Sequence, residues 1–217
     1  MSSEYSIVGQ ALNAAEAIFW DFDGVLKDSV DVKTDAYVGL FRPFGEGLSQ
    51  KVKAHHERHG GVSRFEKIPL YMGWAGETPT AEAVAAYCQR FSEMVKQAVI
   101  DSPWVPGVLA YLEAHSERQY FVLVTATPQA EIDEILARLG VARFFRAVIG
   151  APTPKAAAIR NLLARRGIAA ERAIVVGDSE TDHAAALANG VPFVLRTTPL
   201  NGAIQATHTG LTFERLD

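Results

Sequence analysis

Cysteine is almost absent from this sequence, and basic charge is not in surplus. Cys88 is the single cysteine among 217 residues, which excludes an internal disulfide and a metal site built from several cysteines. The 21 Lys and Arg residues are outnumbered by 25 Asp and Glu, for a net charge of -4. We therefore expect neither nucleic acid nor an anionic membrane as the main partner, although small anions can still bind locally.

Long apolar runs are missing as well. No uninterrupted apolar stretch reaches the roughly 18 residues of a membrane span, and the N-terminus lacks a basic region that leads into an apolar one. We expect a cytoplasmic protein with no membrane partner. Hydrophobic residues make up 48% of the chain, which is ample for a buried core. Nothing in the sequence indicates the oligomeric state.

The order of predicted elements indicates an α/β fold. After Pro103, short apolar runs that are typical of buried strands alternate with helical segments, a pattern of βαβ units that form a parallel sheet with helices on both faces. Thr127 is predicted to cap a helix that begins at Pro128, and the tail after Arg196 has no predicted element. The predicted strands cover residues 17–20, 120–124, 147–149, 173–176 and 192–195.

Residues between the first and second predicted strands contain only helical signals. The long apolar stripe of the last of these helices includes Cys88, which we expect to be a packing residue. We predict a Rossmann-like core of residues 1–27 and 105–217, with an all-helical cap of residues 28–104 inserted after the first strand. The predicted helix starts are Asp31, Ser49, the pair Ser63 and Glu66, and the pair Thr78 and Pro79.

Two carboxylates follow the first predicted strand directly. Asp21 and Asp23 are separated by one residue and followed by Gly24. Each raises the pKa of the other unless a cation neutralises them or one keeps its proton. The pattern therefore indicates a metal site, an acid/base pair, or both. Gly24 permits a tight turn whose backbone N–H groups are open to an anion.

Polar residues also follow the other predicted strands. Thr125 ends the second strand, and Asp178 and Asp182 follow the fourth. Lys155 lies in the first turn of a helix, where a cation is electrostatically unfavourable unless it faces an anion. In an open parallel sheet the ligand crevice lies at the carboxyl ends of the strands, so we expect these side chains to lie close together.

In these motifs the sequence resembles the haloacid dehalogenase superfamily of hydrolases. The segment Asp21-Phe22-Asp23-Gly24-Val25 resembles the first motif, Thr125 the second, Lys155 the third, and residues 177–182 the fourth, all in the family's order. The inserted helices resemble the family's cap. The resemblance implies a Mg²⁺-dependent phosphatase that acts on a small phosphorylated metabolite through an aspartyl-phosphate.

The resemblance also implies a role for each matching residue. Asp21 is expected to be the nucleophile, and Asp23 the general acid and base with its backbone carbonyl on the metal. Thr125 and Lys155 are expected to assist catalysis by contacting the phosphate. The expected metal ligands are Asp21, Asp23, Asp178 and Asp182, the last as ligand or support, and the expected phosphate contacts are Gly24, Thr125, Ala126 and Lys155.

The cap is expected to determine specificity. Residues 60–67 are our candidate for a substrate-facing loop, in which Arg64 and Lys67 suit a polar, anionic leaving group, with a helix-helix turn as the alternative. We expect His55, His56 and His59 to lie on a solvated helix face rather than in a metal site, because charged residues surround them. Hinges between cap and core are expected near residues 27–29 and 103–106.

Several functions stay open at this point. Asp23 argues against the dehalogenase and phosphonate-cleaving branches of the resembled superfamily. We favour a phosphatase, with a sugar phosphate as the substrate. A phosphomutase could use the same aspartyl-phosphate, and a non-catalytic regulatory protein that binds a phosphorylated ligand could retain the fold.

Overall fold

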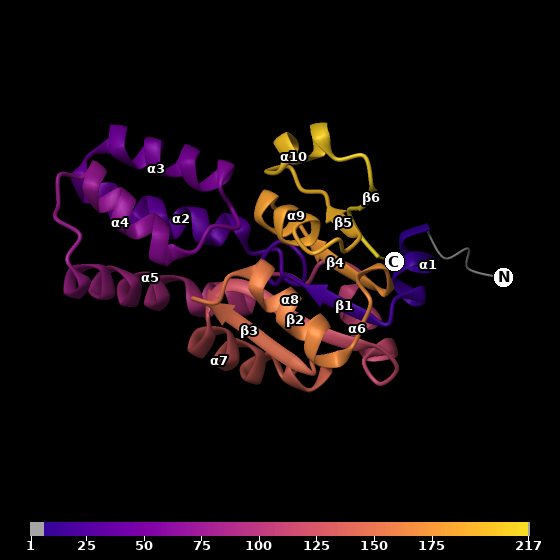
Figure 1. The fold of residues 1–217 in the computed structure, drawn as a ribbon. Coiled ribbons are helices and arrows are strands. Elements are labelled where there is room, and N and C mark those ends of the chain that lie inside the picture. Colours follow the sequence, from indigo (N-terminus) through magenta and orange to yellow (C-terminus); the bar gives the residue numbers. More distant parts are fainter. Residues whose placement is uncertain (1–6, 217) are drawn as a thin grey trace.

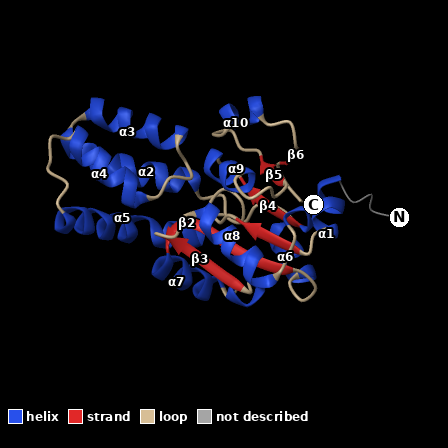
Figure 2. Cartoon of the chain, viewed as in Figure 1, coloured by secondary structure: helices blue, strands red, loops and turns tan. Residues whose placement is uncertain are grey.

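A parallel sheet of six strands forms the centre of the computed structural model, which describes residues 7–216. The strand order is β3-β2-β1-β4-β5-β6, so β1 lies between β2 and β4 (Figure 2). The strands are β1 (Ala17–Trp20), β2 (Tyr120–Pro128), β3 (Ala147–Ala151), β4 (Ala173–Gly177), β5 (Phe193–Arg196) and β6 (Leu211–Phe213). The predicted α/β fold with a parallel sheet is confirmed.

Helices cover both faces of the sheet, and its central strands are therefore buried on both sides. In β1, Ile18 and Trp20 belong to one hydrophobic cluster, while Ala17 and Phe19 belong to a second cluster on the other face. The first cluster includes residues of α1 (Ile7–Ala14), α6 (Val108–His115) and α7 (Gln129–Leu139), and the second includes residues of α8 (Lys155–Arg166) and α9 (Glu180–Leu187). None of the helices in residues 7–216 has both the length and the apolarity of a membrane span.

Four helices between β1 and β2 form a separate group beside the sheet, which we call the cap (Figure 1). Its centre is aromatic: the ring centroids of Tyr37 and Phe91 are 4.2 Å apart, and those of Tyr37 and Tyr71 are 5.5 Å apart. Cys88 is half-buried and packs against this core. The cap helices are α2 (Val30–Phe41), α3 (Glu46–Arg58), α4 (Arg64–Trp74) and α5 (Ala81–Asp101).

The two segments that connect cap and core lie side by side. The backbone N–H of Asp28 donates to the carbonyl of Pro103 at 2.9 Å, and that of Val105 donates to the carbonyl of Leu26 at 2.9 Å. The buried Lys27 donates to the carbonyl of Ile100 at 3.0 Å. The boundaries at 27/28 and 104/105 and the hinges there stay predictions.

A buried ion pair joins the cap to the core at a second place. Arg64 of α4 donates from both terminal nitrogens to Glu131 of α7, at 2.8 and 2.6 Å, and the same guanidinium donates to Ser92 of α5 at 2.5 Å. The two side chains are only 3% and 6% exposed. Burial raises the pKa of Glu131, but hydrogen bonds and charge from Arg64, with a hydrogen bond from Ser92, lower it below its usual value.

Several helix starts differ from those predicted. Ser29, not Asp31, precedes α2, and Ser49 lies inside α3, where its hydroxyl donates to the carbonyl of Gly45 at 3.3 Å. Ser63 caps α4 as predicted. Helix α5 begins two residues later than expected because Thr80, not Thr78, caps it.

One prediction about the core is wrong, and one segment that the sequence left uninterpreted has regular structure. Strand β2 continues through Pro128, so Thr127 caps no helix, and its hydroxyl instead donates to the charged Asp23 at 3.2 Å. The tail after Arg196 adds α10 (Gly202–Thr207) and β6, which pairs with β5 through Val194 and Leu211. A strand of three residues is too short for its alternation to be recognised.

The buried pair allows a test of how cap and core are joined. Glu131→Gln is expected to lower the free energy of unfolding by about 3 kcal/mol, because it leaves the guanidinium of Arg64 buried without a counter-charge. Glu134→Gln, one turn further along α7, removes an exposed partner of Lys96 and is expected to cost less than about 1 kcal/mol. Urea unfolding of both variants checks this, and equal small losses would contradict it.

Candidate active site

Acidic and basic side chains from distant parts of the chain meet at the carboxyl ends of the strands. Asp21 follows β1, Asp178 follows β4, and Asp182 lies in the first turn of α9. Lys155 at the start of α8 lies between two of them, with its Nζ 3.0 Å from Asp21 Oδ2 and 2.6 Å from Asp182 Oδ1. Burial lowers the pKa of Lys155, but the charges of Asp182 and Asp21 outweigh burial and raise it above its usual value.

Local structure places these groups. Ser179 caps α9, and its hydroxyl and backbone N–H both donate to Asp182 Oδ2, at 2.5 and 3.2 Å. Gly24 has φ +75°, and a Cβ on it would lie 2.1 Å from Asp178 Oδ2. Only glycine therefore allows the turn after β1 to approach Asp178 so closely.

The acidic cluster carries more negative charge than Lys155 balances. Burial and the charge of Asp182 raise the pKa of Asp21 to about 7, although Lys155 opposes this. Burial, Asp21 and Asp182 raise the pKa of Asp178 well above its usual value. A cation bound among these carboxylates would relieve the repulsion and restore their ionised forms.

The geometry of the cluster fits a divalent cation with oxygen ligands. Asp21, Asp178 and Asp182 each offer a carboxylate oxygen, and these oxygens lie within 4.8 Å of one another. Hard carboxylate oxygens suit Mg²⁺. Both oxygens of Asp182 accept hydrogen bonds, from Lys155 and Ser179, and those of Asp21 contact Lys155 and the backbone N–H of Phe22, so Asp178 has the fewest competing donors of the three.

The carboxylate of Asp23 lies outside that group and is held by other donors. Its Oδ1 accepts from Ser29 Oγ at 2.7 Å, and its Oδ2 accepts from Lys33 Nζ and from Thr127 Oγ1. Burial raises the pKa of Asp23, but the charge and hydrogen bond of Lys33, with hydrogen bonds from the two hydroxyls, lower it below its usual value. The expected metal contact through its backbone carbonyl stays a prediction.

Lys33 is one of the site residues that the sequence reasoning missed. Its Nζ bridges Asp23 and Thr127, with 2.9 Å to the Thr127 hydroxyl. A signal was present in the sequence, because Val30, Lys33 and Tyr37 recur at helical spacing just after the two acids, and all three line the same pocket.

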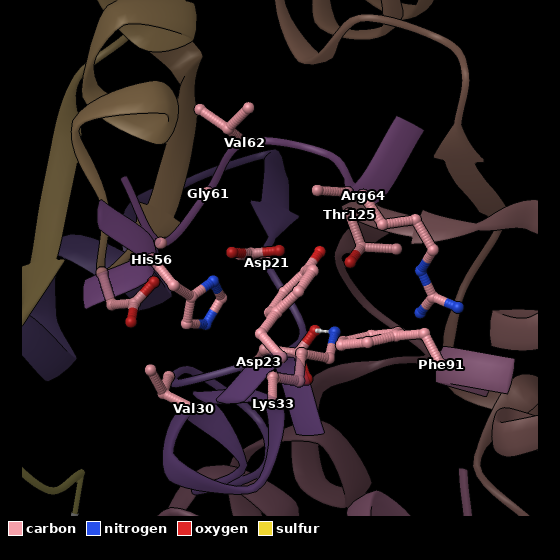
Figure 3. A pocket seen from close by; sticks show the side chains of 14 residues that line it. Asp21, Asp23, Val30, Lys33, His56, Gly61, Val62, Arg64, Phe91 and Thr125 are labelled. Atoms are coloured by element: carbon pink, nitrogen blue, oxygen red, sulfur yellow. Dashed lines mark hydrogen bonds and ion pairs between the residues drawn. The ribbon is translucent and has the colours of Figure 1, made fainter. Parts of the chain in front are cut away.

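A small cavity of about 50 Å³ lies between the strand ends and the cap (Figure 3). Thr125 is buried and lines it together with Ala126, while Lys155 is reached through an adjoining groove. The lining residues from the core include Asp21, Asp23, Thr125 and Asp178, and those from the cap include Lys33, Tyr37, His56, Arg64 and Phe91.

The two cap cations expected to contact substrate are placed differently from each other. Arg64 lines the cavity, with its guanidinium bound to Glu131. Lys67 does not line it: its Nζ is buried in the cap, 2.8 Å from His56 Nδ1 and 3.4 Å from the carbonyl of Gly60. Both belong to α4, so the loop ends at Ser63 rather than at residue 67. Their contact with substrate stays a prediction.

The expected solvated face of α3 is wrong for His56 and His55. His56 is 3% exposed because it packs against Tyr37, with the two ring centroids 4.7 Å apart. It also lines the cavity. His55 is half-buried, with its Nδ1 2.9 Å from the hydroxyl of Tyr71. Flanking charges did not reveal this because they lie on other faces of the same helix.

Comparison with known proteins gives consistent results. The model of the haloacid dehalogenase-like hydrolase family matches residues 18–195. The chain is 28% identical over 189 residues to a phosphorylated carbohydrates phosphatase of Thermotoga maritima, covering 81% of this chain and 82% of that one. It is 29% identical over 200 residues to a phosphoglycolate phosphatase of Rhodospirillum rubrum, covering 83% of this chain and 78% of that one.

A solved structure shares the fold. CbbY from Rhodobacter sphaeroides, in complex with phosphate, superimposes with a TM-score of 0.73 at 17% sequence identity, covering 93% of this chain and 95% of that one. At this identity the likeness establishes the arrangement of elements and not the chemistry.

The acidic cluster predicts a response to metal. Asp178→Asn is expected to raise the melting temperature in magnesium-free buffer, because an amide at this position neither adds a like charge to the cluster nor has to bind a proton to avoid one. Saturating Mg²⁺ is expected to stabilise the unsubstituted protein by about 3 kcal/mol at a hundredfold excess over Kd, and the variant far less. Differential scanning calorimetry measures both, with the exposed Glu180→Gln as the control. A variant that gains as much from Mg²⁺ would contradict the site.

The same cluster predicts a pH dependence without metal. The pKa of Asp21 is about 7 in the folded chain and 3.8 as the ordinary value, so its contribution to stability is fully present below 3.8 and is lost as the pH rises through about 7. Urea unfolding in magnesium-free buffer should show stability falling over this interval, and Asp21→Asn should flatten the fall. An unchanged slope in the variant would exclude Asp21 as the cause.

Proposed function

The chain belongs to the haloacid dehalogenase-like hydrolase family, and from this we propose that it is a Mg²⁺-dependent phosphomonoester hydrolase with Asp21 as nucleophile. One observation carries the proposal: the Lys155 ammonium lies 3.0 Å from the Asp21 carboxylate, at a strand edge where Asp178 also converges. A buried anion held beside a fixed cation is suited to attack a phosphate that is itself anionic.

The first step forms a bond between a carboxylate oxygen of Asp21 and phosphorus, while the bond between phosphorus and the ester oxygen breaks. Lys155 positions the nucleophile and offsets negative charge on the phosphoryl oxygens. Thr125 lines the cavity next to Asp21, where its hydroxyl can donate to a phosphoryl oxygen. Asp21 and Asp178, with the Asp23 carbonyl, would hold a Mg²⁺ ion, which would supply further charge neutralisation.

Asp23 is the proposed general acid and base. In the first step its proton passes to the departing alkoxide, and in the second its carboxylate takes a proton from the water that attacks the aspartyl-phosphate. Lys33 keeps Asp23 ionised in the free protein, which is the form needed for the second step. A phosphate dianion entering beside Asp23 opposes Lys33 and favours the protonated form needed for the first.

The proposed substrate is a small phosphorylated metabolite. The two relatives described above are named for phosphorylated carbohydrates and for phosphoglycolate, and the cavity of about 50 Å³ favours a compact molecule over a large one. Helices of the cap form the wall of the cavity opposite the strand ends, which limits the access of water to the reacting groups. Sugar phosphates with short carbon chains and phosphoglycolate are therefore the first compounds to test.

Phosphate release with and without EDTA tests the proposal. The protein with Mg²⁺ should hydrolyse p-nitrophenyl phosphate, and Asp21→Asn should lower kcat by about a thousandfold or more because the nucleophile is lost. The exposed Asp35→Asn on α2 is the matched control and should retain activity. Rearrangement of a sugar phosphate without release of phosphate would indicate a phosphomutase. Tight binding of phosphate esters with no turnover would indicate the non-catalytic alternative.

Asp23→Asn tests the acid/base assignment separately. The variant should lose about a hundredfold to ten-thousandfold in kcat on an alkyl phosphate, whose leaving group needs a proton. The loss in the rate of phosphorylation should be much smaller with p-nitrophenyl phosphate, whose leaving group departs as an anion. Rapid-quench measurement of the first turnover compares the two substrates. Equal losses on both would contradict a role for Asp23 as the acid.

A further inference from the structure

One polar atom in the wall of the cavity has no role in the chemistry proposed above. His56 of α3 is 3% exposed, and its imidazole projects into the cavity from the cap side (Figure 3). Among the described residues, nothing forms a hydrogen bond with its Nε2, which is itself buried. A buried N–H group without an acceptor is costly, so the fold retains it at the expense of stability.

The other ring nitrogen of His56 is fixed by a lysine. Its Nδ1 lies 2.8 Å from Lys67 Nζ, which also donates to the carbonyl of Gly60 at 3.4 Å. Lys67 is 1% exposed and is outside the cavity lining, so it approaches the ring from the side away from the cavity. Nδ1 and Nε2 point to opposite sides of an imidazole ring, and Nε2 therefore faces away from Lys67.

The charges around the ring determine where its proton lies. Burial, together with the charges of Lys67, Lys33 and His55, lowers the pKa of His56 well below its usual value, so the imidazole is neutral. The charged ammonium of Lys67 has no lone pair and can only donate, so opposite this form Nδ1 is the acceptor. The single ring proton then lies on Nε2.

The positive charge on this side of the cavity is not balanced by the protein alone. Lys33 is paired with Asp23, and Arg64 is paired with Glu131. Lys67 forms no ion pair with any described residue, and burial together with Lys33 lowers its pKa to about 7 despite the opposing charge of Glu66. An oxygen atom that carries negative charge would therefore be stabilised beside His56, both by a hydrogen bond from its ring N–H and by the charge of Lys67 on the other side of the ring.

We propose that His56 is a specificity-determining residue whose Nε2–H donates a hydrogen bond to an oxygen on the leaving group of the substrate, with Lys67 as the positioning residue that fixes its tautomer. This inference rests on the proposed function. Nε2 is covered in the present arrangement of cap and core, so the acceptor enters with the substrate before the cap closes. The leaving group must therefore carry a hydroxyl or carboxylate oxygen beyond the ester oxygen.

Three phosphate esters with the same two-carbon chain test this. Ethyl phosphate has no further oxygen, 2-hydroxyethyl phosphate carries a hydroxyl, and 2-phosphoglycolate carries a carboxylate. With Mg²⁺ the unsubstituted protein should show a kcat/KM at least about tenfold higher for one or both of the last two, and which one is preferred identifies the acceptor. Equal kcat/KM for all three would overturn the inference.

Variants at His56 separate recognition from a structural role. His56→Leu should lower the ratio of kcat/KM for the preferred ester to kcat/KM for ethyl phosphate by about tenfold or more. His56→Gln, which retains an N–H donor, should recover part of the preference. A uniform loss on all three esters in both variants would show that His56 only supports the fold. No turnover of these esters or of p-nitrophenyl phosphate by the unsubstituted protein would count against the proposed function itself.

The tautomer gives a readout independent of activity. In ¹⁵N-labelled protein, His56 should show a protonated Nε2 and an unprotonated Nδ1 at neutral pH, and Lys67→Met should shift the population toward the other tautomer. Finding the proton on Nδ1 in the unsubstituted protein would overturn the inference even if His56→Leu failed to fold.

Discussion

The contact of Lys155 with Asp21 and Asp182 is the constraint on which the site depends. Three acids are gathered at one edge of the sheet, and burial makes their mutual repulsion strong. One lysine, bound at 3.0 and 2.6 Å, offsets part of that charge and orients the carboxylate of Asp21. The negative charge that Lys155 does not offset lies near Asp178, and it favours the binding of a cation at this edge of the sheet. Glycine at position 24 is required for the chain to approach so closely.

The cap completes what the sheet begins. Its helices supply Lys33, which controls the ionisation of Asp23, and they bring His56 to the opposite wall of the cavity. The buried pair between Arg64 and Glu131 holds one edge of the cap on the core, away from the two connecting segments. In the proposed function, the reacting groups lie at the strand ends of the core, whereas the groups proposed to distinguish one leaving group from another lie on the cap. Specificity can change in such a protein while the chemistry is retained.

Pairing of charges distinguishes the cations around the cavity. Lys155, Lys33 and Arg64 each have a carboxylate partner, so their charge is committed to holding a side chain in place. Lys67 has a histidine instead. A cation that polarises a neutral imidazole makes it a better donor, so the proposed role of His56 would give the pocket a directional contact without adding a second charge beside a bound phosphate.

Sequence alone determined the parallel α/β core and which of its strand ends carry acids, because strand burial and strand-end position are local properties of the chain. Asp21 and Asp23 could be recognised in this way. Tertiary structure decided the rest. Thr127 donates a hydrogen bond to Asp23 instead of capping a helix, and Lys33 binds the same carboxylate. The ring of Tyr37, from another helix, packs against His56, which is buried. The partner of Thr127 lies 104 residues away and the partner of His56 lies on another helix, so neither contact is encoded in the spacing of neighbouring residues; Lys33 is only ten residues from Asp23, and its helical spacing was a signal for that contact.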